Sequence, residues 1–168
     1  LLKNLPDSAS GVIASAFENP PAASTDEFID TTPEVYWRAC KILCLLSREI
    51  HIVDPYLNPL KRDCKSIFTK FITEIGKLSK VQSISFWTRL ANLQNYSGSS
   101  YKQDISRLIE SSLTTSDKQM KITLNLVNDE TSSDKLHARY LISNVGGIKL
   151  DQGFQQLPAD RKNMVSTM

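Results

Sequence analysis

The sequence predicts an α/β protein in which helices flank a mixed, largely parallel sheet. Segments with helical and strand-like hydrophobic periodicity alternate along the chain, and its 168 residues match the size of one ordinary domain. Alternation of this kind favours parallel strands joined by crossover helices. The predicted elements are, in order, helix 34–48, strand 49–54, helix 61–78, strand 81–87, helix 101–114, strand 120–127 and two strands within 135–154.

Residues 1–33 are predicted to form a leading segment, and residues 34–168 the domain itself. Residues 8–17 have the pattern of a short helix, but prolines follow at positions 20, 21 and 33. Thr32 as N-cap and Pro33 at the first helical position then begin the first strong helix. Much of its apolar face is expected to come from aliphatic side chains: Val35, Ile42, Leu45 and Leu46.

The middle of the chain supplies the sheet and its covering helices. The strand from residue 49 is rich in β-branched residues and is expected to end near Asp54, because Pro55 cannot continue a central strand. Helix 61–78 carries apolar residues at helical spacing, and helix 101–114 follows a Ser- and Gly-rich loop. Strand 120–127 alternates apolar and polar residues most clearly.

The last segment, 135–154, has the pattern strand, Gly-Gly turn, strand, glycine. Successive side chains of a strand face opposite sides, so His137 and Arg139 are predicted to project from the same face. An imidazole can act as nucleophile or proton carrier near neutral pH, and a guanidinium suits phosphate oxygens. The pair therefore suggests a phosphoryl site, although such a pair is also common as solvated surface decoration.

Further candidates lie where the predicted parallel strands end. Ligands of open α/β sheets bind beyond the carboxyl ends of strands, which makes Asp54, Tyr56, Trp87 and Arg89 candidates for the rim of a site. For each of these residues taken alone there is a structural alternative to a role in a site. Tyr56 and Trp87 would then pack in the core or at an edge, and Arg89 would be a solvated strand end.

Composition excludes several classes of protein. With 20 basic and 18 acidic residues the net charge is +2, so there is no global polybasic signature of a non-specific nucleic-acid binder. Cys40, Cys44 and Cys64 form no paired CxxC arrangement, so we expect a reduced, cytoplasmic protein with no metal and no cofactor, and Cys40 and Cys44 in the core. No apolar run approaches the roughly 20 residues that span a bilayer, so no membrane partner is expected.

These stretches together resemble the phospholipase D-like superfamily from about residue 34 to the end. The likeness rests on segments 52–56 and 136–142, followed by Gly146-Gly147-Ile148 and Gly153-Phe154. It is greatest to a branch of single-motif prokaryotic proteins, some of them associated with nucleases and antiphage defence. The superfamily motif is His-x-Lys, an Asp five residues after the Lys, and then a glycine-rich segment. Two such motifs meet at one phosphodiester site.

The resemblance implies that His137 attacks phosphorus to give a phosphohistidine, while the cation at Arg139 holds the non-bridging oxygens. Arg139 stands where Lys is usual, and Asn144 stands where the usual Asp would orient the imidazole. Asp151 is the alternative orienting group. His51 lacks a paired cation and is predicted to be structural, so the second motif would come from a homodimer or from sequence outside this chain.

The first function that follows is a metal-independent phosphodiesterase, or nuclease, acting on DNA or RNA. The alternative is a catalytically inactive domain that binds nucleic acid or a protein partner, for example a protein of a defence system. A lipid phosphodiesterase ranks last. Basic residues that could line a groove for a nucleic-acid backbone are Lys61, Arg62, Arg89, Lys102, Lys135, Arg139 and Lys149.

Overall fold

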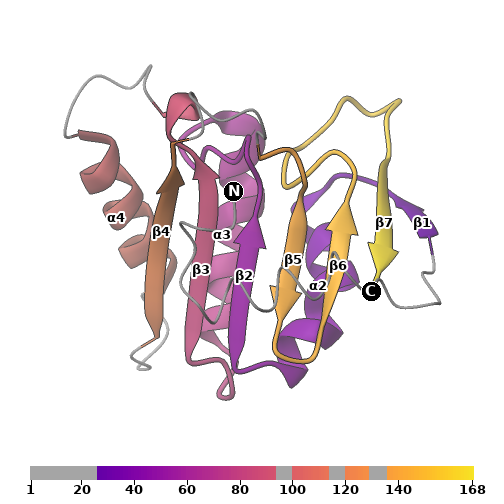
Figure 1. The fold of residues 1–168 in the computed structure, drawn as a ribbon, viewed down its shortest axis with the longest axis horizontal. Coiled ribbons are helices and arrows are strands. Elements are labelled where there is room, and N and C mark those ends of the chain that lie inside the picture. The colour runs from indigo at the N-terminus through magenta and orange to yellow at the C-terminus, as the bar shows by residue number, and fades with distance from the viewer. Residues whose placement is uncertain (1–25, 94–99, 114–119, 129–135) are drawn as a thin grey trace.

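The structure of the protein, a computed structural model, describes residues 26–93, 100–113, 120–128 and 136–168; the short helix predicted over 8–17 lies outside them. The described residues form a seven-stranded sheet in the order β1-β7-β6-β5-β2-β3-β4 (Figure 1). Its strands are β1 (Asp26–Ile29), β2 (Glu49–Val53), β3 (Ser83–Arg89), β4 (Lys121–Val127), β5 (Tyr140–Ser143), β6 (Gly146–Leu150) and β7 (Asn163–Thr167). The helices are α2 (Pro33–Leu46), α3 (Arg62–Gly76), α4 (Ser100–Leu113) and the short 3-10 helix η2 (Leu90–Asn92).

The α/β class and the mixed sheet are confirmed, but the expectation of a largely parallel sheet is wrong. Parallel pairing is limited to β2 with β3 and β3 with β4, and the other four neighbouring pairs are antiparallel. Part of the physical reason is that β5, β6 and β7 follow one another without a crossover helix, so these neighbouring strands run antiparallel.

Two strands, β1 and β7, were not predicted from the sequence. β1 lies inside the predicted leading segment and pairs with β7, in the register Asp26 to Ser166 and Ile29 to Asn163. Three of the four residues of β1 are exposed, so this edge strand has no clear apolar alternation to reveal it. The domain of the structure therefore begins before residue 34.

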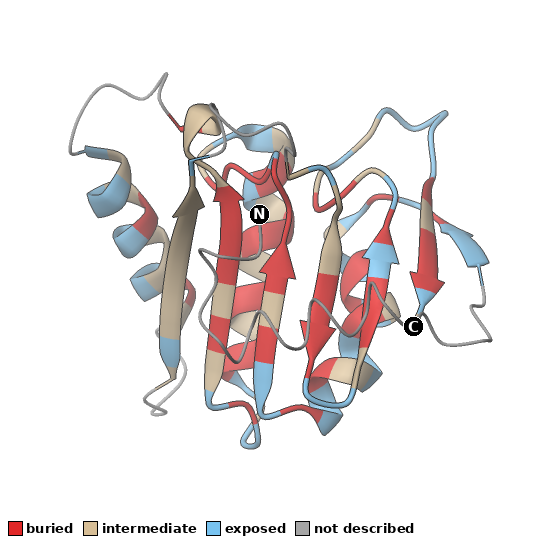
Figure 2. Cartoon of the chain, in the orientation of Figure 1, coloured by how far each residue is buried: buried red, intermediate tan, exposed pale blue. Residues whose placement is uncertain are grey.

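α2 and α3 lie behind the sheet in Figure 1, and α4 packs against α3. One face of the central strands provides the core between sheet and helices, and Figure 2 shows buried residues alternating with less buried ones along β2 and β3. Its fully buried members include Ile50, Ile52, Ile84, Phe86 and Leu141. On the opposite face Val53, Trp87 and Ile142 form a smaller buried cluster, so Trp87 has a packing role.

α2 begins as predicted but buries a different face. Thr32 caps it by accepting a hydrogen bond from the amide of Val35 (3.3 Å), with Pro33 in the first turn. The buried side chains are Tyr36, Trp37, Cys40 and Cys44, whereas Ile42, Leu45 and Leu46, which we predicted to face the core, are exposed. Aromatic packing explains the choice of face: Trp37 meets Phe71 edge to face at 5.7 Å, and Tyr36 stacks on Phe154 at 6.1 Å. The burial of both cysteines in the core is confirmed.

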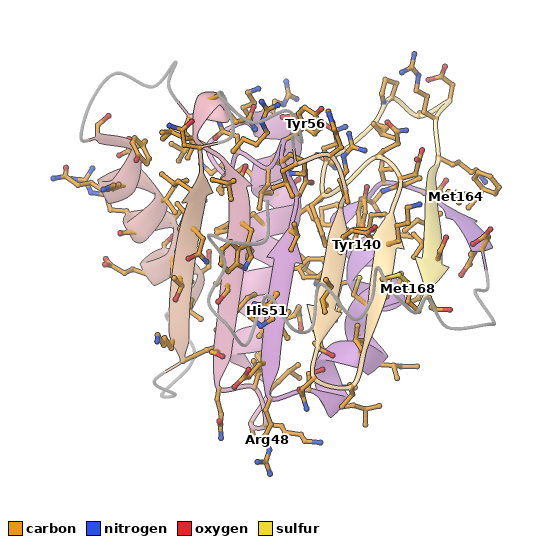
Figure 3. The ribbon with its side chains drawn as sticks, viewed as in Figure 1. Arg48, His51, Tyr56, Tyr140, Met164 and Met168 are labelled. Carbon is orange, nitrogen blue, oxygen red and sulfur yellow. The ribbon has the colours of Figure 1, made fainter. Side chains whose placement is uncertain are left out.

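The strands of the sheet end along two opposite borders, named here the carboxyl edge and the amino edge. The carboxyl edge is where β2, β3 and β4 end and β5 begins, and Tyr56 marks it in Figure 3. The amino edge is where β2, β3 and β4 begin and β5 turns into β6, and Arg48 marks it. Within the described residues, none of the helices is both long and apolar enough to cross a membrane.

Candidate functional site

The carboxyl edge brings together three positions that are far apart in the sequence. Val53 at the end of β2 pairs with Tyr140 at the start of β5, so the next residues outward, Asp54 and Arg139, lie at the same edge. The amide of Leu150 donates to the carbonyl of Arg139 (2.9 Å), which places the exit of β6 beside them. Antiparallel pairing of β5 with both β2 and β6 therefore assembles the site.

Asp54 is the buried hub of this edge. Its side chain accepts hydrogen bonds from the amide of Phe154 (2.8 Å, Oδ2) and from that of Tyr56 (2.9 Å, Oδ1). The residue is 3% exposed, and burial raises the pKa of its carboxyl, although the hydrogen bonds and the charge of Arg139 partly oppose that rise. Asp54 therefore holds the edge together, and it lies buried beneath the rim of the site for which we named it a candidate.

Gly153 is needed where the loop after β6 passes over Asp54. Its φ is +71°, and a Cβ at this position would overlap the carboxylate of Asp54 and lie 2.7 Å from Cδ of Arg139. Its carbonyl accepts hydrogen bonds from the hydroxyl of Tyr36 (2.7 Å) and from Nδ2 of Asn163 (3.0 Å). The residue is buried and lacks a side chain, so its role is to let the loop pass close over Asp54.

Arg139 is held from several sides. Its Nη1 donates to the carbonyl of Asp151, and its Cζ lies 4.8 Å from the centroid of the Tyr56 ring. Its Nε is buried and has no hydrogen-bond partner among the described residues. Tyr56 is 40% exposed, so a fixed cation and the face of an aromatic ring meet at the surface of the carboxyl edge.

His137 is exposed at the same edge, two residues before Arg139. We predicted both residues to lie in a strand, but β5 begins only at Tyr140, so residues 136–139 lead into it. None of the described residues forms a hydrogen bond with the His137 imidazole. Arg89, half-buried at the end of β3, joins the edge because its amide donates to the carbonyl of Pro55 (3.4 Å).

Asn144 is not brought to this site. It follows β5, at the amino edge, where its Oδ1 accepts hydrogen bonds from the amides of Arg48 (3.0 Å) and Glu49 (3.5 Å). The whole of β5 separates it from His137. The five-residue spacing that pointed to Asn144 thus reaches the far end of a strand, and its side chain ties the β5–β6 turn to the start of β2.

The other two polar candidates also have local roles. The Asp151 carboxylate is exposed and accepts a hydrogen bond from Nε2 of Gln152 (2.6 Å). His51 pairs with Ile142 in the sheet, its Nδ1 is buried without a hydrogen-bond partner among the described residues, and burial lowers the pKa of the imidazole. At about 3.3 Å per extended residue, the five residues from Ile142 to His137 put His51 roughly 16 Å from the level of His137, too far to share one phosphorus atom.

A hydrogen-bond network that supports the site from beneath was not predicted from the sequence. The Tyr36 hydroxyl shares its single proton between the carbonyls of Gly153 and Gln155 (2.7 and 3.0 Å) and accepts from Nδ2 of Asn163 (2.7 Å). Burial raises the pKa of Tyr36, so the hydroxyl stays protonated and able to donate. The sequence feature that could have indicated this network was a tyrosine on an otherwise apolar face of α2. No pattern near Asn163 indicated its role.

No group of three or more His, Cys, Asp or Glu side chains that could hold a metal ion occurs among the described residues. No protein-family model and no curated protein matches the chain. One solved structure does align, that of TrmBL2, an archaeal chromatin protein whose structure shows a novel mode of DNA binding. The alignment has a TM-score of 0.36 and 11% sequence identity, and it covers 95% of this chain and 52% of that one, so this chain spans about half its length. A likeness at that score carries no argument about function.

Proposed function

We propose that this chain is a phospholipase D-like domain that binds the phosphodiester backbone of nucleic acid at its carboxyl edge without hydrolysing it. The observation that carries the proposal is the fixed guanidinium of Arg139, placed against the exposed ring of Tyr56 and tied to the carbonyl of Asp151. A guanidinium that is already ordered loses little conformational freedom when it grips phosphate oxygens.

The neighbours of Arg139 suit a nucleic-acid strand. His137 is exposed beside it, Arg89 adds a second cation, and the Tyr56 ring offers a face on which a base can stack. Asp54 lies behind the Arg139 guanidinium and interacts with its charge. This interaction fixes the position of the cation but also reduces the positive charge that it presents to a ligand. Such a site supports moderate, salt-sensitive binding.

Within the described residues the His137 imidazole has no hydrogen-bond partner, which argues against turnover. A histidine nucleophile needs a partner that fixes its tautomer and stabilises its charged form. Asn144 lies at the other edge, and the only side-chain hydrogen bond of Asp151 among the described residues joins its Oδ2 to Nε2 of Gln152 and not to His137. We therefore place binding ahead of the phosphodiesterase that the resemblance to the superfamily suggested first.

Hydrolysis is the second candidate, because His137 is exposed on the same edge as Arg139. Since His51 cannot supply the second imidazole, this candidate requires a homodimer that places two copies of His137 at one phosphorus atom, with no metal. A role in antiviral defence, a defence-system protein partner and the choice between DNA and RNA stay predictions from the resemblance.

Fluorescence anisotropy with labelled single-stranded DNA, duplex DNA and RNA tests the binding proposal at two salt concentrations. Arg139→Ala should weaken binding by about tenfold or more, because it removes charge-assisted hydrogen bonds to phosphate. Arg107→Ala is the matched control, since it removes the same charge from an exposed position on α4 (74% side-chain exposure). Equal affinity of the two variants would reject the assignment of Arg139.

A denaturing gel of the same oligonucleotides, incubated in EDTA, separates the two candidates. We expect no cleavage by the wild-type protein. Cleavage that disappears in His137→Ala, together with a dimer in sedimentation equilibrium, would favour the phosphodiesterase.

A further inference from the structure

An exposed cluster of aliphatic side chains lies at the amino edge. Ile42, Leu45 and Leu46 stand on the last turns of α2 with exposures of 72%, 42% and 52%, and Val145 in the β5–β6 turn is 51% exposed. The turn lies beside the end of α2, since the Cβ direction of Gly146 points to Cδ1 of Leu43 at 3.6 Å. We call these four residues, Ile42, Leu45, Leu46 and Val145, the apolar tip.

Cations without an ion pair among the described residues lie along the amino edge and on α2 next to the apolar tip. Arg48 lies at this edge (Figure 3), and hydrogen bonds connect its carbonyl to the amide of Gln82 (2.7 Å) and the carbonyl of Gln82 to the amide of Lys121 (3.0 Å). Five exposed cations of this region form no ion pair among the described residues: Arg38, Lys41, Arg48, Lys80 and Lys121.

Among the described residues, the acidic side chains near these cations are turned away from them or already paired. Glu74 is bound by Lys70 and Lys77, at 3.0 and 3.1 Å. Glu49 alternates with Ile50, which faces the helices, so Glu49 points to the side of the sheet away from α2. The described part of the amino edge therefore combines a small apolar surface with a positive surround.

We propose that the amino edge is a docking surface for an anionic lipid bilayer. An interfacial contact needs a few aliphatic side chains that enter the boundary between headgroups and acyl chains, and cations that meet anionic headgroups. The apolar tip supplies the first and its surround the second. No long apolar segment is required, which is why the sequence predicted no membrane partner.

Other occupants fit the same surface less well. A stable protein complex buries about 800 Å² on each partner, and four partly exposed aliphatic side chains offer only a few hundred. A second copy would bring like charges together around the tip. A nucleic-acid backbone would satisfy the cations but leave the aliphatic side chains without a favourable contact.

This inference does not rest on the proposed function, because the amino edge and the candidate site lie at opposite ends of β2 and β5. Failure of one therefore leaves the other unchanged.

Co-sedimentation with vesicles tests the inference. The probe is a phosphatidylcholine vesicle with about 30% phosphatidylserine, compared with pure phosphatidylcholine. The wild-type protein should sediment with the anionic vesicles only. The double variant Leu45→Asn/Leu46→Asn should lose about tenfold in vesicle affinity, because the apolar contact is removed. Phe28→Asn is the matched control, since Phe28 is 65% exposed on β1 and lies outside the tip.

A second pair of variants tests the charge. The double variant Lys41→Glu/Arg48→Glu should lose about fivefold or more in vesicle affinity for each cation that is replaced. Arg161→Glu with Lys162→Glu makes the same charge change on the loop before β7 and should bind as the wild type does. Unfolding midpoints check that all variants fold.

Two outcomes would overturn the inference. One is absence of sedimentation with anionic vesicles; if a dimer then dissociates in the Leu45→Asn/Leu46→Asn variant, the tip is a self-association surface. The other is vesicle binding that persists in that variant at wild-type affinity.

Discussion

Replacing Gly153 by alanine tests the assembly of the carboxyl edge most directly. At a φ of +71° an alanine costs about 1–2 kcal/mol relative to glycine. The added methyl group would also overlap the Asp54 carboxylate, which is buried and accepts two amide hydrogen bonds. Loss of one of these two buried hydrogen bonds would cost about a further 1–3 kcal/mol, so we expect Gly153→Ala to lower the free energy of unfolding by roughly 2–5 kcal/mol.

The assay is urea unfolding followed by circular dichroism, with nucleic-acid affinity measured on the folded protein. Affinity should fall as well, because the same methyl group would lie 2.7 Å from Cδ of Arg139 and displace its side chain. Gly147→Ala is the control: its methyl group would meet the flexible end of Met168 at 3.0 Å, so a loss below about 1 kcal/mol is expected.

A Gly153→Ala protein as stable as Gly147→Ala would refute this reasoning. It would mean that Asp54 can leave its two amide donors at little cost, and that the edge is not held together by the carboxylate.

Three further predictions concern the polar side chains around the sheet. Burial raises the pKa of Asp54 above its ordinary 3.8, so the folded protein keeps this proton to higher pH than the unfolded chain does. The free energy of unfolding should therefore fall as pH rises from about 4 through the folded pKa, and urea titrations should show a smaller slope in Asp54→Asn. Burial lowers the pKa of His51 below its ordinary 6.5, so stability should fall as pH drops below that value. His51→Gln should flatten that part of the pH profile, and an unchanged profile would contradict it. Asn144→Ala should cost about 0.5–1.5 kcal/mol through the lost amide contacts yet leave nucleic-acid affinity unaltered; a tenfold loss of affinity would place Asn144 in the site after all.

The site was only partly predictable from the sequence. Asp-Pro after a β-rich run marked the end of β2, and the glycines of the last segment marked turns, because proline and glycine restrict the backbone locally. The sequence could also place His137 and Arg139 two residues apart. It could not show that Arg139 would be held by Asp151 and Tyr56, since those contacts depend on which strands become neighbours.

The five-residue spacing from Arg139 gave a wrong location for Asn144, because a strand lies between the two residues. Asn144 is five residues from Arg139 in sequence, but an extended strand carries it to the opposite edge. Tyr36 and Asn163 meet beneath Gly153 although 127 positions separate them, and no local pattern marks such a pair.

The sequence by itself determined the alternation of helices and strands after residue 33, the start of α2 and the buried cysteines, because periodicity and capping are local properties. Only the tertiary structure decided which face of α2 is buried, which strands run antiparallel, and which polar groups share the carboxyl edge. Those choices depend on the aromatic packing of Trp37 on Phe71 and of Tyr36 on Phe154, and on pairing between strands distant in sequence. The same packing left a second aliphatic stripe of α2 exposed at the amino edge, where it forms most of the apolar tip.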